Sequence, residues 1–152
     1  MDEKYFMNEA LKEAQQAFEE DEVPIGAVAV YKNQIVGRGH NQIERLQDPT
    51  AHAEIIAITA AANALSSWRL EEVIVYTTVE PCIMCAGALV HARVKKVIFG
   101  ARDEKFGGCG SIFNIVQEKK LNHQIEIVEG VMAAEAASLM KSFFEKKRKD
   151  RK

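Results

Sequence analysis

The sequence lacks the features that mark membrane-spanning, secreted and repetitive proteins. No apolar run approaches the roughly 20 residues that a membrane-spanning helix requires. The opening residues MDEKYFMNEA are polar and mixed in charge, unlike a secretory signal. There is no internal repeat, low-complexity tract or linker, and only three cysteines are present. Together these absences predict a cytoplasmic protein in a reducing setting, without a membrane partner.

The composition is typical of a globular protein. The chain has 152 residues, of which 47% are hydrophobic and 28% are charged. This is enough apolar material for a full core without disulfides, and the length favours a single domain over residues 1–152. The net charge of -2 at neutral pH argues only weakly against a nucleic-acid partner.

Charge is distributed unevenly along the chain. Residues 141–152 contain seven basic and two acidic side chains, a charge of +5 that leaves -7 on residues 1–140. Basic side chains at the end of a helix can simply complement the helix dipole in solvent. They can also form an arm that contacts phosphates. The charge count alone leaves both interpretations open.

Hydrophobic periodicity predicts alternating helices and strands. Helices are expected over 4–20, 50–65, 81–93, 111–117 and 132–149, and strands within 24–41, 73–79, 95–101 and 124–130. Segment 24–41 forms two strands joined by a turn near Asn33. Thr50 is expected to cap its helix, and Pro81 to occupy the first turn of the next one. This order predicts an α/β fold, a three-layer α/β/α sandwich on a mixed five-stranded sheet with an antiparallel first hairpin.

The first chemical signal is the pair Cys82 and Cys85, in EPCIMC. Cysteines three apart lie on one face of a helix. Both fall in the first turn, where the helix dipole favours thiolates. Two thiolates at this spacing make half of a zinc site, but redox dithiols use the same spacing and also begin a helix after a strand. Taken alone, the pair does not separate metal binding from redox chemistry.

His52 and Glu54 lie close together in DPTAHAEIIAI, at the start of a helix that is otherwise apolar. Helix starts gather at one edge of the sheet in α/β folds, so His52 can meet Cys82 and Cys85 there. Three protein ligands leave the fourth tetrahedral position for water, which is the catalytic pattern. The alternative is an ordinary buried core histidine, and the two cysteines favour the zinc ligand.

Glu54 supplies the remaining chemistry, because a buried carboxylate is costly unless it has a partner. Water bound to a neighbouring zinc ion would be such a partner for Glu54. The metal lowers the pKa of bound water to about 7, and a carboxylate can take that proton and pass it on. The four residues therefore predict hydrolytic attack on an electron-poor carbon, with Glu54 as general acid and base.

HAE followed by PCIMC resembles the signature of the cytidine and nucleotide deaminase superfamily, in which the glutamate is not a zinc ligand. Longer blocks narrow the resemblance to bacterial tRNA-specific adenosine deaminases along nearly the whole chain: DEVPIGAVAV, DPTAHAEI, TVEPCIMCAGALVHARV, VIFGARD, LNHQIEIVEGV and SFFEKKR. The resemblance implies a cytidine deaminase-like fold, one Zn2+ per chain, and a homodimer whose anticodon pockets involve both subunits. It also implies hydrolytic conversion of the wobble adenosine in the anticodon of an arginine tRNA to inosine.

Matched residue by residue, the resemblance implies roles at the centre of the site. His52, Cys82 and Cys85 match the zinc ligands, and Glu54 matches the proton shuttle. Asn41, in GRGHNQ, matches the asparagine that contacts the base. An amide can read an adenine edge through paired donor and acceptor groups.

Further matches lie where the RNA would enter. Asp103 and Lys105 are in the loop that meets the nucleotides flanking the target. Phe143, Phe144 and Arg148 match a closing helix that lines the RNA groove, where aromatic stacking and phosphate contacts are expected. One of the two phenylalanines is expected to pack in the core instead.

Two residues near the motifs have no assigned role. Glu80 can either orient the metal site from behind the ligands or cap the following helix. Cys109 lies in FGGCGS, and a fourth thiolate on zinc would close the site to water. We therefore expect Cys109 to be a free thiol that fills a small space.

Two other functions remain as alternatives. One is a zinc-dependent deaminase of a free base or nucleoside, such as guanine or cytosine. The basic tail and the GARDEKFGG loop favour RNA over that substrate. The other is a non-catalytic, zinc-stabilised RNA-binding module, which would need neither Glu54 nor an open fourth ligand position.

Overall fold

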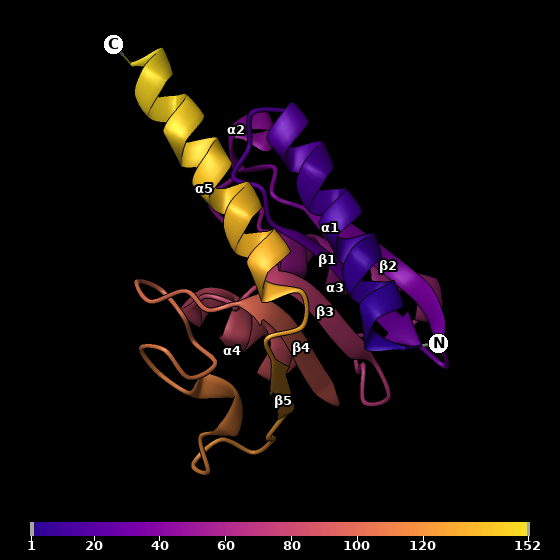
Figure 1. Ribbon diagram of the computed structural model, residues 1–152. Helices are drawn as coiled ribbons and strands as arrows, with labels where there is room; N and C mark the ends of the chain where they lie inside the picture. The colour runs from indigo at the N-terminus through magenta and orange to yellow at the C-terminus, as the bar shows by residue number, and fades with distance from the viewer. Residues whose placement is uncertain (1, 152) are drawn as a thin grey trace.

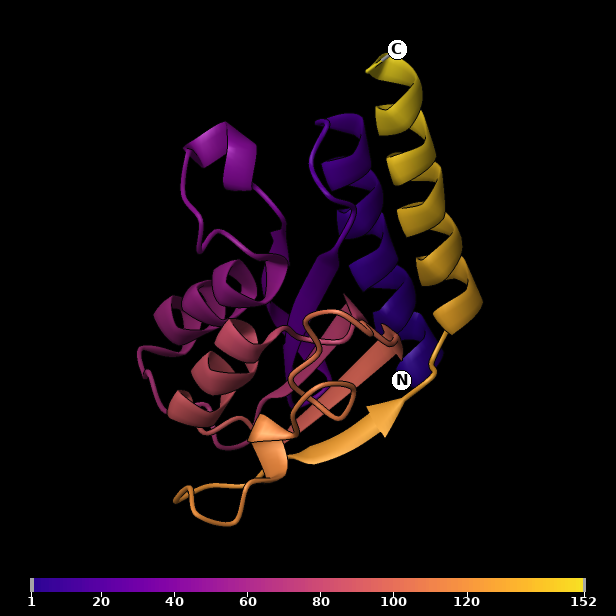
Figure 2. The same cartoon turned by 90° about the vertical axis from the view of Figure 1, so that its left-hand side faces the viewer.

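The computed structural model describes residues 2–151, and a five-stranded sheet divides this part of the chain into layers. The strands are β1 (Gly26–Tyr31), β2 (Gln34–His40), β3 (Ile74–Val79), β4 (Lys96–Ala101) and β5 (Glu126–Glu129). One face of the sheet carries α1 (Glu3–Glu19) and α5 (Ala133–Asp150), and the other carries α3 (Ala53–Leu65) and α4 (Ile83–His91) (Figure 1; Figure 2). The predicted three-layer α/β/α sandwich is confirmed.

The sheet is mixed, and its strand directions bring two helix starts to one edge. Its order is β2-β1-β3-β4-β5. Strand β1 runs antiparallel to both β2 and β3, whereas β3, β4 and β5 are parallel. The first hairpin closes at Lys32 and Asn33, whose φ angles of 49° and 63° are those of a tight two-residue turn. Because β2 and β3 run in the same direction, α3 and α4, which follow them, begin at the same edge.

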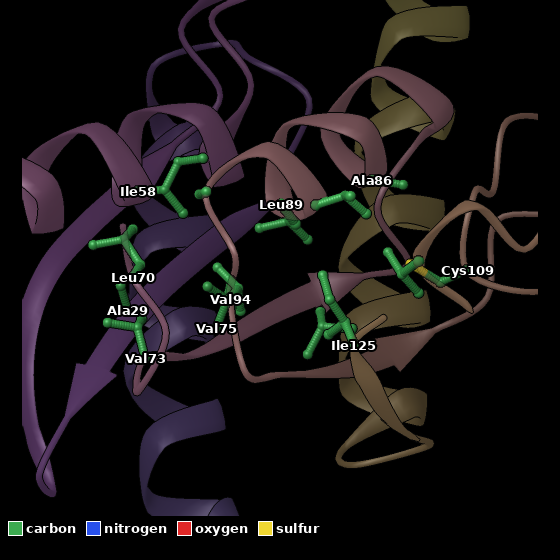
Figure 3. Packing of buried hydrophobic residues seen from close by; sticks show 14 of the residues in the cluster. Ala29, Ile58, Leu70, Val73, Val75, Ala86, Leu89, Val94, Cys109 and Ile125 are labelled. Atoms are coloured by element: carbon green, nitrogen blue, oxygen red, sulfur yellow. The ribbon is translucent and has the colours of Figure 1, made fainter. Parts of the chain in front are cut away.

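Apolar side chains fill both spaces between the sheet and its helices. Burial of each large side chain contributes about 1.5–3 kcal/mol relative to leaving it exposed. The larger cluster, under α3 and α4, includes Ile58, Leu70, Val75, Leu89, Val97 and Ile125 (Figure 3). The cluster under α1 includes Phe6, Met7, Val28, Tyr76 and Ile98. Packing on both faces of the sheet therefore fixes the position of the edge at which α3 and α4 begin.

A glycine in β2 lets α3 approach the sheet closely. A Cβ atom at Gly39 would collide with the backbone of Ala53 and Ala57 in α3. The alanines on this side of the helix are themselves fully buried. The absence of a side chain at Gly39 therefore brings the first turn of α3, and His52 before it, against the end of the sheet.

The start of α3 differs from the predicted one. Thr50 is not the cap, because its hydroxyl donates to Asp48 Oδ1 at 2.8 Å and its N–H binds the same oxygen. This local turn competes with helix initiation. His52 occupies the N-cap position instead and makes no side-chain capping bond. The imidazole of His52 is therefore not bound to the helix backbone and is available to other groups.

The start of α4 also differs, because the prediction for Pro81 was wrong. Pro81 precedes the helix, and Cys82 is the N-cap residue. The Cys82 Sγ accepts a hydrogen bond from the Cys85 backbone N–H at 3.5 Å. A sulfur atom thus does the capping that serine or aspartate usually does.

The connections contain one element that the pattern did not predict, the short helix α2 (Ile43–Leu46). Within the expected helix 111–117 only a single 3-10 turn forms, η1 (Ile115–Gln117). The remaining predicted helices and strands are present within a few residues of their expected ends. No helix described over residues 2–151 is long and apolar enough to cross a membrane.

Candidate active site

Three potential metal ligands meet at the shared edge. His52 Nδ1 lies 3.6 Å from Cys82 Sγ and 3.5 Å from Cys85 Sγ, and all three atoms fall within 4.8 Å of one another. His52 comes from the start of α3 and the cysteines from the start of α4. Within residues 2–151 no second group of three His, Cys, Asp or Glu side chains gathers in this way.

The spacing of these atoms fits a tetrahedral zinc ion. With Zn–N of about 2.0–2.1 Å and Zn–S of about 2.3 Å, tetrahedral angles separate nitrogen from sulfur by about 3.5 to 3.6 Å. The two measured nitrogen–sulfur distances are 3.6 and 3.5 Å. One imidazole and two thiols are also ligands that zinc prefers. The donor set therefore passes a geometric and a chemical test for this metal.

The protonation of the donor set also favours a cation. A hydrogen bond with Cys85 lowers the pKa of Cys82 to about 4. The same contact and burial raise the pKa of Cys85. The hydrogen bond with Cys82 raises the pKa of His52. A bound dication would stabilise both cysteines as thiolates.

Glu54 lies beside the donor atoms in the first turn of α3, with only 3% of its surface exposed. Burial raises the pKa of Glu54 to about 7, and a hydrogen bond from its own backbone N–H partly opposes this. A carboxyl group whose pKa is near neutrality can both take and give a proton. The acid that the sequence singled out is thus buried beside the donor side chains.

Asn41 is buried directly after β2, with 3% exposure. Its Oδ1 accepts the Ala53 backbone N–H at 2.8 Å, which satisfies one of the free amides at the start of α3. The oxygen is therefore engaged with the helix.

The loop after β4 is organised around two acidic side chains. Asp103 Oδ1 accepts the backbone N–H groups of Lys105 and Phe106, at 3.0 and 3.1 Å. Glu80 is 3% exposed and binds the loop from the other side. Burial opposes its ionisation, but hydrogen bonds from Ser111 and from loop amides hold the pKa of Glu80 below its usual range. The helix-cap role expected for Glu80 does not match these contacts, because Cys82 caps α4 itself.

Three predicted RNA contacts line one cleft, of about 1120 Å3, between the ends of α1, α2 and α5: Lys105, Phe144 and Arg148. These helix ends lie at one end of the molecule (Figure 2). Asn41, Asp103 and the three metal donors are not among its lining residues. The structure therefore separates the predicted site into a buried centre and an open cleft.

The two phenylalanines of α5 point to different surroundings. Phe143 is 4% exposed and meets the ring of Phe18 in α1 edge to face, with centroids 5.9 Å apart. Phe144 is 43% exposed, whereas Phe143 borders the same cleft only from its buried wall. Phe143 is thus the core residue, and Phe144 is the one available to an RNA base.

Two basic residues of the cleft, one of them from the basic tail, are held in ion pairs. Arg45 in α2 lines the cleft and pairs with Glu20, its NH1 3.2 Å from Oε1. Lys147 in α5 pairs with Asp21, with its Nζ 2.6 Å from Oδ2. The charge of Arg45 is visible in the sequence, but no motif marks it. Lys152, the last basic residue counted in the tail, lies outside the described residues.

Cys109 is a buried free thiol, as expected. It is 3% exposed and belongs to the apolar cluster under α4, where it lies near Ala86 (Figure 3). Burial raises its pKa. It is not part of the metal-donor group.

Comparisons with known proteins agree with this geometry. Residues 1–148 match the family model described as MafB19-like deaminase. A protein of Bacillus subtilis (strain 168) named tRNA-specific adenosine deaminase is 49% identical over 147 residues, which are 97% of this chain and 91% of that protein. This chain belongs to the tRNA-specific adenosine deaminase family.

Solved structures place the family in a wider fold. One from work on A-to-I editing by tRNA:A34 deaminases at the wobble position of transfer RNA is 40% identical, with a TM-score of 0.86, over 89% of this chain and 98% of that one. A guanine deaminase from Nitrosomonas europaea is 21% identical. It has a TM-score of 0.81 over 93% of this chain and 84% of that one. This second likeness shows the fold alone. The fold is therefore the cytidine deaminase-like one that the signature implied.

Proposed function

We propose that this chain hydrolytically deaminates the wobble adenosine of an arginine tRNA anticodon to inosine. The observation that carries the proposal is likeness over 97% of the chain to proteins named tRNA-specific adenosine deaminase. The whole of residues 1–152 would act as one zinc-dependent domain. The proposed substrate, like the three reduced cysteines, is consistent with a cytoplasmic setting.

His52, Cys82 and Cys85 would hold one zinc ion per chain, since their atoms have the spacing described above. The bound metal supplies an activated water at neutral pH. Glu54 would then move the protons of the reaction. It can deliver one to the ring nitrogen next to the attacked C6 of adenine and another to the departing amine. Burial of Glu54 supports this role because its pKa is raised to about 7.

Substrate binding would combine a fixed donor with an adaptable cleft. The NH2 group of Asn41 can donate to the target base from a rigid position, because its oxygen is anchored on α3. Asp103 and Lys105 would meet the nucleotides flanking the target. Phe144 can stack on a base, and Arg148 can contact phosphate. Exposure of Phe144 and its place in the cleft with Arg148 support these roles.

The active form would be a homodimer. Ile83 and Met84 expose 42% and 38% of their surface directly after the metal-donor Cys82. A second copy seated on these apolar side chains would bring its own residues close to the anticodon. Sedimentation of the purified protein at micromolar concentration should give twice the 17.0 kDa mass of the chain. A monomer at that concentration would contradict this part of the proposal.

The function is tested by inosine formation on an arginine anticodon stem-loop. Free adenosine, cytidine and guanine are assayed beside it, together with a stem-loop that carries guanosine at the wobble position. Inosine should form only in the adenosine-containing RNA. Release of ammonia from free guanine or cytidine, without turnover of the RNA, would favour the small-molecule alternative. Binding of RNA with no turnover by zinc-loaded protein would favour the non-catalytic module.

A further inference from the structure

Glu80 is a buried carboxylate whose side chain binds one loop at four donors. Its Oε1 accepts the Asp103 N–H at 3.0 Å and the Ser111 hydroxyl. Its Oε2 accepts the N–H groups of Cys109 and Ser111, at 3.1 and 3.0 Å. The donors span the two ends of segment 103–111, which carries Asp103 and Lys105. The carboxylate thus draws both ends of the segment together.

The residues beside Glu80 hold the same segment through their backbone. Gly108 donates its N–H to the Pro81 oxygen at 2.8 Å. Gly107 forms an isolated antiparallel bridge with Cys82. Residues 80–82 therefore contact segment 103–111 through one side chain and two backbone positions. Cys82 is also one of the three metal donors, so the segment is attached directly to the metal site.

A carboxylate is the side chain that this arrangement requires. Its two oxygens accept all four hydrogen bonds without offering a donor of their own. An amide in the same place would keep one oxygen and turn an NH2 group toward N–H donors. Buried donors would then lose their partner, which costs more than the bond itself contributes. The close packing leaves no room for adjustment, since a Cβ at Gly107 would collide with Glu80 Oε2.

We propose that Glu80 is a positioning residue that fixes segment 103–111, and Lys105 with it, relative to the metal donors. It would connect the buried centre of the site to the open cleft, because Lys105 lines that cleft. This inference rests on the proposed function for its effect on RNA, but the contacts themselves do not. Loss of Glu80 should loosen the segment and weaken RNA binding, while the metal and the proton shuttle stay in place.

The test is Glu80→Gln in the full chain loaded with zinc. Amide hydrogen exchange at Asp103, Cys109 and Ser111 should become roughly 10- to 100-fold faster, as expected when charge-assisted hydrogen bonds of a buried carboxylate are lost. The KM for the arginine anticodon stem-loop should rise roughly tenfold, and kcat should change much less. Zinc content should stay at that of the wild type. Glu80→Asp should restore part of the protection, because it keeps the charge.

Glu22→Gln is the matched control. Glu22 is also a buried carboxylate, 2% exposed, and it accepts the backbone N–H groups of Glu44 and Arg45 at 3.1 and 2.7 Å. Its loss should speed exchange in α2 and leave exchange in segment 103–111 unchanged. Gly107→Ala disturbs the Glu80 contact from the loop side, because the added Cβ would collide with Glu80 Oε2. Gly107→Ala should show the same changes in exchange and KM that are expected of Glu80→Gln. It therefore tests the inference independently if Glu80→Gln folds poorly.

Three outcomes with the Glu80→Gln variant would overturn the inference. Unchanged exchange in segment 103–111 would show that Glu80 does not hold it. Faster exchange with an unchanged KM would show that the segment does not position RNA. Loss of zinc in Glu80→Gln would show that Glu80 supports the metal site instead. Wild-type protein that leaves the stem-loop unchanged would overturn the proposed function and the RNA half of this inference. The exchange measurement would then still show whether Glu80 holds segment 103–111.

Discussion

The buried centre of the site and the open cleft are built by different means. The centre consists of donor atoms within 4.8 Å of one another, placed by the first turns of two packed helices. The cleft is formed by three helix ends and carries exposed ion pairs, such as Lys147 with Asp21. Exposed pairs are weak because water screens them. Chemistry should therefore depend on a few atoms, and RNA affinity on many small contributions. Single substitutions should abolish function at the centre and produce graded losses in the cleft.

The largest effect is expected from removal of a metal donor. Cys82→Ala should lose most of its zinc and all measurable deamination, because it removes both a ligand and the N-cap contact to Cys85. Zinc per chain by elemental analysis checks this, with Cys109→Ser as the control. The control should keep about one zinc per chain, since a fourth ligand is not part of the set. Metal loss in Cys109→Ser would mean that the donor set is wrongly assigned.

The next effect separates metal binding from proton transfer. Glu54→Gln fills the same buried space but cannot carry protons, so single-turnover inosine formation should fall by about 100- to 10,000-fold. Zinc content and RNA affinity should remain, because Glu54 is not among the grouped metal donors. The measurement pairs elemental analysis with RNA binding and turnover for each variant. Near-normal turnover, or zinc lost together with activity, would remove Glu54 from its proposed role.

The centre could be predicted from the sequence because its chemistry is carried by short motifs. A histidine and two cysteines at helix starts have few alternatives once the sheet brings those starts to one edge. What failed there was local: Thr50 was expected as the cap of α3, but Asp48 binds both its hydroxyl and its N–H. The competition between a turn and a helix cap is decided by backbone geometry, which periodicity does not report.

The cleft could be predicted only in part, because its residues meet across long sequence distances. Lys147 and Asp21 are 126 positions apart, and nothing in either segment indicates their pairing. Helix α2 has four residues, too few to show a periodic pattern. The sequence predicted that one of two adjacent phenylalanines would be buried. Only the packing of α5 on α1 decides that it is Phe143.

Substitution of the two phenylalanines should divide stability from binding. Phe144→Ala should weaken stem-loop binding roughly 5- to 150-fold, since stacking contributes about 1–3 kcal/mol per base, and should leave the thermal midpoint nearly unchanged. Phe143→Ala should instead destabilise the fold by about 3–5 kcal/mol, as expected for a buried aromatic side chain. Fluorescence-monitored unfolding and RNA titration check the two outcomes. The two variants are compared at equal fractions of folded protein. If both then lose the same RNA affinity, the assignment of Phe144 to binding and Phe143 to stability is contradicted.

The smallest effects should come from single charges in the cleft, and they should not be equal. Arg148 and Arg151 line the cleft and are exposed. Lys147 is tied to Asp21 at 2.6 Å, and this hydrogen bond lowers the pKa of Asp21. A lysine already paired with a carboxylate adds little net charge to the cleft. It should therefore contribute less to phosphate binding than an unpaired arginine.

The salt dependence of RNA affinity measures this difference directly. Arg148→Gln with Arg151→Gln should lower the slope of log affinity against log salt by about 1.5 to 2, because each phosphate contact contributes roughly 0.7 to 1. Lys147→Gln should lower it by less than half of the change for a single arginine. Turnover at saturating RNA should change little in both variants, since the metal donors do not line the cleft. Equal slopes for the wild type and the double arginine variant would mean that these side chains only complement the end of α5.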